Sequence, residues 1–336
     1  MNALGKLPLL LLCLVLLTGC ACQLTPSPAP SASPSSASSP APGGQGLVRL
    51  PEGLHLGLDG APLVDVFVVE SQAVEQMDME SYLAGVLAGE MQGDWPLEAL
   101  KAQALLARTF ALRFLLDQGG SKYEGADLST DIEEAQAYNA EGVNDNILAA
   151  IEQTRGLVIV DEEGLPIKAW FHAHSGGQTA TAKEGLGYEK AEPAYICSVP
   201  VDESPEAPAE AQAWSARFDL EEVSEALASL GGGDASTLAI EQTGPSGRVT
   251  RFSAGDNSVS GPGLRLALGG TRMRSTLLTE LRVEDGFVYM AGKGYGHGVG
   301  MSQWGAYALA KEGKSAEEIV EAFFQDVRVV SAWSAA

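Results

Sequence analysis

The stretch GKGYGHGVGMSQWGAYA occupies residues 292–308. Glycine stands at every second position from 292 to 300, so the backbone there can approach a ligand closely, although a set of tight turns would give the same pattern. The residues that follow predict a helix, whose free N–H groups would suit polar ligands near His297, Ser302 and Gln303. The stretch is neither a phosphate-binding loop nor a dinucleotide-binding fingerprint, because the spacing of both motifs is missing.

The segments on the N-terminal side of this stretch predict a mixture of helices and strands. Helices are expected from about Asp78 to about Gln92, from residues 94–96 to just before Gly119, over 143–154 with Asn144 near the cap, and over 219–230. Strands are expected over 62–70 and 287–292, and hairpins over 154–173 and 236–254, with 203–213 as a surface loop. This order predicts an α+β fold with an antiparallel sheet.

The first predicted helix carries an acidic residue on its apolar side. Leu83, Val86, Leu87, Glu90 and Met91 follow the spacing of one helix face, so Glu90 lies on or beside the buried stripe. Burial among apolar groups raises the pKa of a carboxyl, as a general acid working near neutral pH requires. A side chain at the edge of the stripe, or one paired with Lys or Arg, would explain the position equally well.

The second predicted helix carries two basic residues among Leu and Ala. Lys101 and Arg108 lie along one face with Ala104 between them. Each needs a partner, since Lys and Arg are almost never buried unpaired. Either they form ion pairs with Glu90 or another acid, or they hold the hydroxyl or carboxylate groups of a substrate. The sequence leaves both alternatives open.

Two histidines at i and i+2, His172 and His174, precede Ser175-Gly-Gly and would project to one face of a strand. They would form a metal pair or the wall of a site. The other candidate ligands, His55, Cys197 and His297, have no recognised metal-binding spacing, so neither a metal nor a cofactor is expected. Ser175 lacks the G-x-S-x-G turn of a serine hydrolase.

Charge excludes one class of partner. The 336 residues include 44 acidic and 21 basic side chains, for a formal net charge of -23. Nucleic acid is therefore not an expected partner, because its binding depends on clustered Lys and Arg, and a neutral or cationic substrate is favoured. The four cysteines do not form a disulfide framework.

The N-terminus predicts secretion. Residues 1–19 contain one Lys and an apolar run shorter than the roughly 20 residues of a membrane-spanning helix. They end in Leu-Thr-Gly before Cys20, which resembles a bacterial lipobox; an ordinary signal peptide is the alternative. Residues 20–46 would be the lipidated Cys and a disordered tether rich in Pro, Ser and Ala. The expected domain spans 47–336, with a variable subdomain around 203–290, anchored by lipid at Cys20 to the outer face of the cytoplasmic membrane and facing the cell wall.

Several segments together resemble the stage II sporulation protein D / LytB family of bacterial cell-wall proteins. The matching segments are 82–91, 98–109, His172 with 175–177 and Thr179, 193–195, Ser260-Gly261, 264–265, 274–275 and 294–307. The resemblance implies a groove for a glycan strand and a lytic transglycosylase acting on peptidoglycan strands, stripped of stem peptides in the best-known case. Glu90 matches the family's catalytic acid. Some clostridial members bind zinc through Cys near the Ser-Gly-Gly segment, but this chain has no Cys there.

The resemblance adds further candidate site residues, and there are two alternative functions. Candidates for binding the sugar and stabilising charge are Lys101, Arg108, His172, Ser175, Tyr195, His297, Ser302 and Gln303. A lytic transglycosylase needs one carboxyl group, because the 6-hydroxyl of the muramic acid is the nucleophile, and it leaves 1,6-anhydro ends. The alternatives are a non-catalytic glycan-binding protein that enhances a cell-wall amidase, and a metal-dependent hydrolase that uses the three histidines.

Overall fold

The computed structural model describes residues 48, 50–51, 53–57 and 60–333. The predicted signal peptide, the lipidation of Cys20 and the tether over 20–46 lie outside the described residues. The fold is α+β, as the sequence predicts. In the described part of the chain, no helix is both long enough and apolar enough to cross a bilayer.

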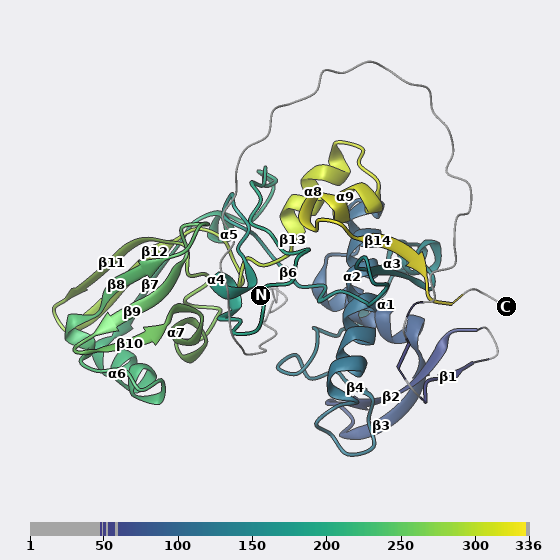
Figure 1. The fold of residues 1–336 in the computed structure, drawn as a ribbon, viewed down its shortest axis with the longest axis horizontal. Helices are drawn as coiled ribbons and strands as arrows, with labels where there is room; N and C mark the ends of the chain where they lie inside the picture. The colour runs from purple at the N-terminus through teal and green to yellow at the C-terminus, as the bar shows by residue number, and fades with distance from the viewer. Residues whose placement is uncertain (1–47, 49, 52, 58–59, 334–336) are drawn as a thin grey trace, which may run out of the picture.

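The elements fall around two hydrophobic clusters, which lie at opposite ends of the molecule in Figure 1. The larger cluster is built on three helices whose ends follow the predicted capping residues: α1 (Met79–Glu90), α2 (Leu97–Gln118) and α3 (Asp145–Gln153). Asp78 caps α1 by accepting from the Ser81 N–H, and Asn144 caps α3 by accepting from the Ile147 N–H. Gly119 ends α2 in the left-handed conformation.

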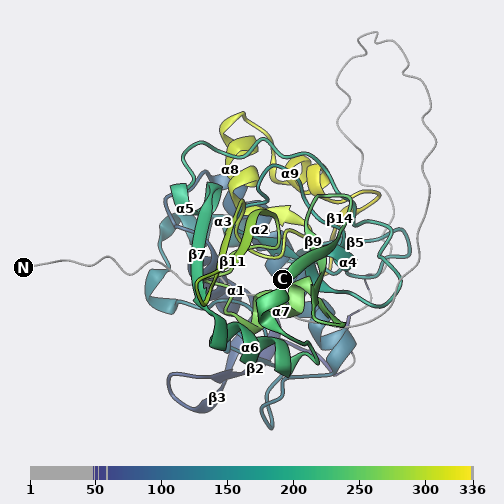
Figure 2. The ribbon, with the colours of Figure 1, turned by 90° about the vertical axis from the view of Figure 1, so that its left-hand side faces the viewer.

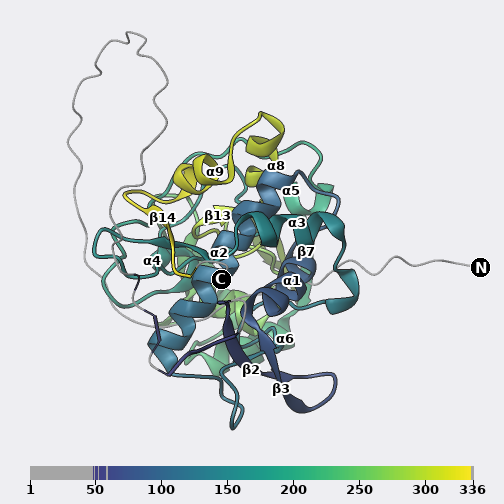
Figure 3. The same cartoon turned by 90° about the vertical axis from the view of Figure 1, so that its right-hand side faces the viewer.

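The rest of this cluster surrounds α2. Helices α8 (Gln303–Lys311) and α9 (Ala316–Phe323) both pack on it, as Figure 3 shows. A sheet with the order β1-β2-β3, with β4 paired to β2, borders the helices. Its strands are β1 (His55–Leu56), β2 (Pro62–Val68), β3 (Ala73–Asp78) and β4 (Leu128–Ser129). Residues from both halves of the chain therefore share one core.

The smaller cluster is formed by two three-stranded antiparallel sheets and two helices, seen end-on in Figure 2. One sheet has the order β10-β9-β8 and the other the order β11-β12-β7. The strands are β7 (Trp214–Asp219), β8 (Ala239–Thr243), β9 (Val249–Ala254), β10 (Asn257–Ser260), β11 (Leu278–Glu284) and β12 (Phe287–Gly292), and the helices are α6 (Leu220–Ser229) and α7 (Gly261–Ala267). The hairpin predicted over 236–254 is confirmed as β8 and β9.

The predicted hairpin over 154–173 is largely wrong. Strand β5 (Leu157–Val160) pairs with β14 (Arg328–Ser331), and β6 (Phe171–His172) is a two-residue strand paired in parallel with β13 (Met301–Ser302). The hairpin forms only at its turn, where Val160 is bridged to Pro166 and the Ile167 N–H donates to the Ile159 carbonyl at 3.1 Å. The partners of both strands come from the C-terminal part of the chain, so local periodicity could not identify them.

Short elements connect the two clusters. Helix α4 (Ala182–Leu186) and helix α5 (Ala209–Gln212) lie between them, near β6 and β13 (Figure 1). The predicted surface loop over 203–213 is thus partly helical. One of its side chains, Glu203, is only 8% exposed, which contradicts the surface assignment for that residue.

The alternating glycines pack against the chain itself. A Cβ on Gly296 would lie 2.8 Å from the His172 Cβ, and one on Gly300 would lie 2.0 Å from the Trp170 carbonyl oxygen. Both residues have positive φ, at 107° and 70°. Glycine is therefore required here so that residues 292–300 can lie directly on residues 170–176. The close approach that the alternation indicates is made to protein rather than to a ligand.

A buried ion pair joins α1 to α2. The Arg108 guanidinium donates to both carboxylate oxygens of Glu80, at 3.2 and 2.5 Å, and to the Leu157 carbonyl. Glu80 also accepts from the Gly156 N–H and the Trp333 indole, each at 3.1 Å. The Arg108 side chain is fully buried. The pair links α1 and α2 to β5 and the C-terminal residues through one carboxylate.

Breaking this pair should destabilise the whole larger cluster. Glu80→Gln leaves the buried Arg108 without a counter-charge, so we expect the free energy of unfolding to fall by about 3–5 kcal/mol in urea titrations. Glu152→Gln is the control, because Glu152 is 74% exposed and its pairing with Arg155 should contribute less than about 1 kcal/mol. Equal effects of the two changes would contradict this account of the pair.

The packing of the glycine segment gives a second prediction. Gly300→Ala should destabilise the protein by about 1–2 kcal/mol for its positive φ, with about 1–3 kcal/mol more for overpacking against Trp170. Gly313→Ala is the matched control: its φ is +87° but no atom lies within 4 Å of the added Cβ. If thermal unfolding shows the same loss for both, the glycines are needed for their dihedral angles alone.

Candidate functional site

Glu90 is the last residue of α1, and only 4% of its surface is exposed. One oxygen, Oε1, accepts from the Ala137 N–H at 2.7 Å. Gly89 makes this contact possible, because a Cβ there would lie 2.6 Å from the backbone of residues 137–138. The sequence Gly-x-x-x-Gly over residues 85–89 thus lets another segment approach the helix closely and hydrogen bond to the acid.

Gln303, the first residue of α8, lies on the other side of Glu90. Its Nε2 is 3.3 Å from the Glu90 carbonyl oxygen and 3.5 Å from the Gln103 Oε1, and its amide acts to lower the pKa of the Glu90 carboxyl. Gln103 and Gln303 are both buried. The acid therefore lies where α1, α2 and the N-terminus of α8 meet.

Burial controls the protonation of Glu90. Desolvation raises its pKa to about 7, while the hydrogen bonds from Ala137 and Gln303 oppose this rise. A carboxyl with this pKa is half protonated near neutral pH. It can then donate a proton and take one back, as general acid-base catalysis requires.

The histidines form a second, neutral group. The His172 Nδ1 lies 3.1 Å from the Val299 carbonyl and so carries its proton, while the His297 Nδ1 accepts from the Val299 N–H at 3.0 Å. The two rings lie 5.7 Å apart. Burial lowers the pKa of His172 well below its usual value and that of His297 to about 3, with nearby Arg residues adding to the effect on His297.

His172, His174 and His297 do not converge on a common point. Across the described residues, no group of three or more His, Cys, Asp or Glu side chains is arranged to hold a metal ion. Within the described part of the chain, the Nε2 atoms of His172 and His174 are buried and have no hydrogen-bond partner. The metal-dependent hydrolase therefore has no geometric support from these side chains.

Three of the residues expected to contact substrate serve the fold instead or are already paired. Arg108 is enclosed by Glu80, so the ion-pair alternative is correct for it. Tyr195 is buried, and its hydroxyl accepts from the Lys168 N–H at 2.8 Å. Lys101 pairs with Glu98 at 2.8 Å on the side of α2. None of the three has a hydrogen bond or ion pair to Glu90 or Gln303 here.

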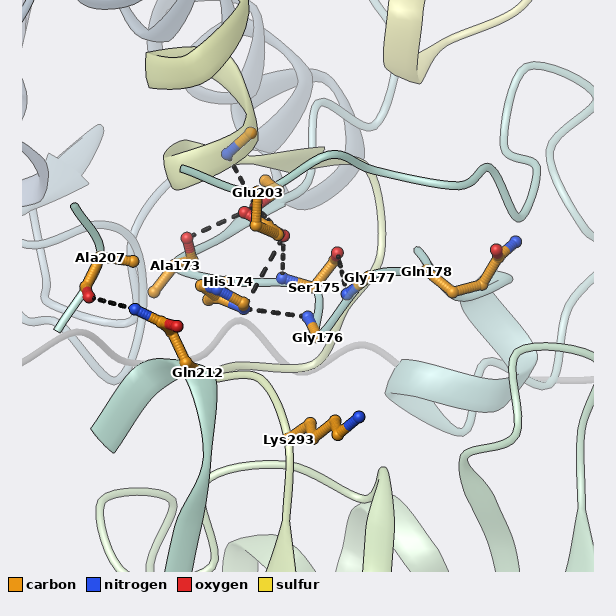
Figure 4. Close-up of polar contacts among 12 residues, drawn as sticks. Ala173, His174, Ser175, Gly176, Gly177, Gln178, Glu203, Ala207, Gln212 and Lys293 are labelled. Atoms are coloured by element: carbon orange, nitrogen blue, oxygen red, sulfur yellow. Dashed lines mark hydrogen bonds and ion pairs between the residues drawn. The ribbon is translucent and has the colours of Figure 1, made fainter. Parts of the chain in front are cut away.

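Ser175 and Ser302 both hydrogen bond to Glu203, a residue that the sequence does not single out. Figure 4 shows Glu203 between the segment that carries His174 and Ser175 and the start of α8. Its Oε1 accepts from the Ser175 N–H at 2.6 Å and from the Ser302 hydroxyl at 2.8 Å. Glu203 stands in a segment rich in Pro, Ala and Glu, a composition that indicates solvent exposure, so nothing local marked it out.

Two surface hollows lie elsewhere. One is lined by β1, β2 and the C-terminal end of α2, including His55, Leu63 and Leu115, and the other lies on the outer face of β7, β11 and β12, around Arg217 and Tyr289. Neither includes Glu90. The expected glycan groove is therefore not one of these two hollows.

Comparison with known proteins identifies a matching family and several relatives of this chain. Residues 69–160 match the family model described as "Stage II sporulation protein". The chain is 30% identical to the stage II sporulation protein D of Bacillus amyloliquefaciens, over 85% of this chain and 84% of that one. It is 27% identical to the protein of the same name from Bacillus subtilis, over 80% and 79%.

A further relative carries a different name. The amidase enhancer of Bacillus subtilis is 26% identical over 74% of this chain and 40% of its own length. The family match covers α1, α2 and α3, and with them Glu90, while the relatives align with most of both chains. The protein therefore belongs to the stage II sporulation protein D family and has a role related to the bacterial cell wall.

Proposed function

We propose that the protein is a peptidoglycan lytic transglycosylase in which Glu90 is the general acid and base. The observation that carries this proposal is a buried carboxyl whose pKa is raised to about 7. A helix end in an apolar core is a costly place for an acid without a task. Similarity to the stage II sporulation proteins supports a substrate in the cell wall.

One carboxyl is enough for the proposed reaction. Protonated Glu90 donates its proton to the glycosidic oxygen as the bond from that oxygen to the muramic C1 breaks. The resulting carboxylate accepts the proton of the muramic 6-hydroxyl, whose oxygen bonds to C1. The products are a 1,6-anhydro end and a free 4-hydroxyl, no water is consumed, and Glu90 ends protonated as it began.

The neighbours of Glu90 suit both halves of this cycle. Burial favours the protonated form that must be present first. The Ala137 N–H donates to the carboxyl, and the Gln303 amide also lowers its pKa, so both groups stabilise the carboxylate that exists between the two proton transfers. Because these donors come from fixed backbone and from a helix N-terminus, little reorganisation is needed during the reaction.

The proposed substrate follows from the resemblance, and the proposed location follows from the N-terminal sequence. The resemblance to the stage II sporulation protein D family implies strands already stripped of stem peptides, so stripped glycan strands are the proposed substrate. Residues 1–19 read as a lipoprotein signal peptide that ends directly before Cys20. We therefore place the protein on the outer face of the bacterial cytoplasmic membrane, held by lipid at Cys20.

A second candidate function is favoured by one specific observation. Similarity to a protein named amidase enhancer raises the alternative of a non-catalytic glycan-binding protein that assists a cell-wall amidase. Such a protein has no use for a buried carboxyl with a raised pKa. Cleavage of strands by the purified protein without an amidase separates the two.

Replacing the acid should abolish cleavage. We expect the native protein to generate anhydro-muramic ends on purified, peptide-free strands and Glu90→Gln to do so at a rate about 10²–10⁴ times lower, because the amide cannot donate the proton. Mass spectrometry of the products measures this. Glu152→Gln, on the exposed face of α3, is the control and should retain full activity. Native protein that binds strands but leaves them uncut would favour the amidase-enhancer function.

The pH dependence has a defined sign. The acid works only when protonated, so kcat/KM should be constant below the Glu90 pKa of about 7 and fall about tenfold for each pH unit above it. Rates of release of anhydro ends between pH 5 and 9 test this. An activity that rises through pH 7–8 would mean that another group is the acid.

A further inference from the structure

Glu203 is a buried carboxylate that the proposed reaction does not use. Its side chain is 8% exposed and lies in the segment between Val201 and α5. We propose that Glu203 is a positioning residue for Glu90, because it fixes the N-terminus of α8 on residues 172–177 and thereby keeps Gln303 against the acid. This inference rests on the proposed function of Glu90.

The contacts of Glu203 hold two segments that are far apart in the sequence. Its Oε1 accepts from the Ser175 N–H at 2.6 Å, and its two oxygens lie 2.8 and 3.0 Å from the Ser302 hydroxyl. Figure 4 shows Glu203 beside Ser175, which it reaches from another segment of the chain. The Glu203 side chain thus joins residues 175 and 302. Hydrogen bonds to a charged group are among the stronger ones in proteins.

The residue that Glu203 contacts on α8 is adjacent in the sequence to the acid's partner, Gln303. Ser302 is the N-cap of α8, where its hydroxyl accepts from the Gly305 N–H at 3.3 Å. The next residue, Gln303, contacts Glu90. Trp304 continues the attachment, since its N–H donates to the Ala173 carbonyl at 3.0 Å and its carbonyl accepts from the Ser204 N–H at 3.4 Å. Displacing the start of α8 would therefore displace Gln303.

The charges around Glu203 favour this arrangement. His174 lies 3.8 Å away through Nδ1, which accepts from the Gly176 N–H, so the ring is neutral. Arg248 is a nearby cation that donates to the Ser175 carbonyl at 2.6 Å. Burial lowers the pKa of Arg248 to about 10, and the charges of Glu184 and Glu203 oppose this shift. The N-terminus of α8 adds the positive end of a helix dipole.

Glu90 itself is surrounded by neutral groups. The Ala137 N–H and the Gln303 amide act on it, and no ionisable group among the described residues contributes to its pKa shift. Moving the Gln303 amide away would therefore raise the Glu90 pKa further, because that amide lowers it. The pH profile then reports on the position of Gln303.

The same segment supplies a matched control. Glu206 accepts from the Tyr307 hydroxyl at 2.6 Å, and Tyr307 also lies on α8. This carboxylate is exposed, and its contact is one turn beyond Gln303. Glu203 and Glu206 thus belong to the same segment and both bind α8. Of the two, only Glu203 binds the residue next to Gln303.

The test compares Glu203→Gln, Glu206→Gln and Gln303→Leu by steady-state release of anhydro ends. We expect Glu203→Gln to lower kcat about 10- to 100-fold with KM within about twofold, and to move the alkaline limit of activity to higher pH, as Gln303→Leu does. The double variant should be no worse than Gln303→Leu alone, because the two residues act through one interaction. Glu206→Gln should leave kcat and the pH profile unchanged.

An unchanged alkaline limit in a folded Glu203→Gln protein, or additive losses in the double variant, would overturn the proposal. If Glu203→Gln does not fold, Ser302→Ala replaces it, since that change removes the hydroxyl but leaves Glu203 bonded to Ser175. A native protein without activity would refute the proposed function instead. The coupling is then tested by titrating the ¹³C-labelled Glu90 carboxyl, whose pKa should rise in Glu203→Gln and stay the same in Glu206→Gln.

Discussion

The contact between residues 292–300 and residues 170–176 is the constraint on which the rest of the structure depends. Glycines fill the positions where any side chain would collide with backbone, as Gly300 does against Trp170. This contact fixes β13 beside β6 and sets where α8 begins. Because α8 begins there, Gln303 meets Glu90, which arrives from α1 through more than two hundred residues of chain. The most glycine-rich stretch of the sequence thus positions Gln303 against Glu90 by packing within the protein, and it need not contact a substrate.

Two buried carboxyl groups on the same helix have different surroundings, and these surroundings separate structure from chemistry. Glu80, near the start of α1, faces a guanidinium and holds four segments together. Glu90, at the end of α1, has only neutral donors around it in the described part of the chain, so burial raises its pKa. A cation at the second position would keep the acid ionised and end its use as a proton donor near neutral pH. Arg108 lies on α2 and pairs with Glu80 rather than with Glu90. This separation of the cation from Glu90 is therefore as important to the proposed chemistry as the acid itself.

Local patterns predicted what depends on local interactions. The ends of α1, α2 and α3 followed from Asp78, Asn144 and Gly119, and the burial of Glu90 followed from its place on an apolar stripe. The partners of β5 and β6, the salt bridge of Arg108 and the burial of Glu203 could not be predicted, because each depends on residues that lie far away in the sequence. Tyr195 shows the same limit: its burial under a backbone N–H leaves no mark on the neighbouring sequence. The roles of His172, His297, Ser175 and Ser302 in binding a sugar remain predictions.

The central claim is that a glycan strand is cleaved at the carboxyl enclosed by α1, α2 and the start of α8. The most direct measurement is a crystal structure of Glu90→Gln with a peptide-free glycan strand bound. The account predicts a glycosidic oxygen within hydrogen-bond distance of the side chain at position 90, with the muramic 6-hydroxyl on the same side. A strand bound to the outer face of β7, β11 and β12, with position 90 still enclosed, would contradict it.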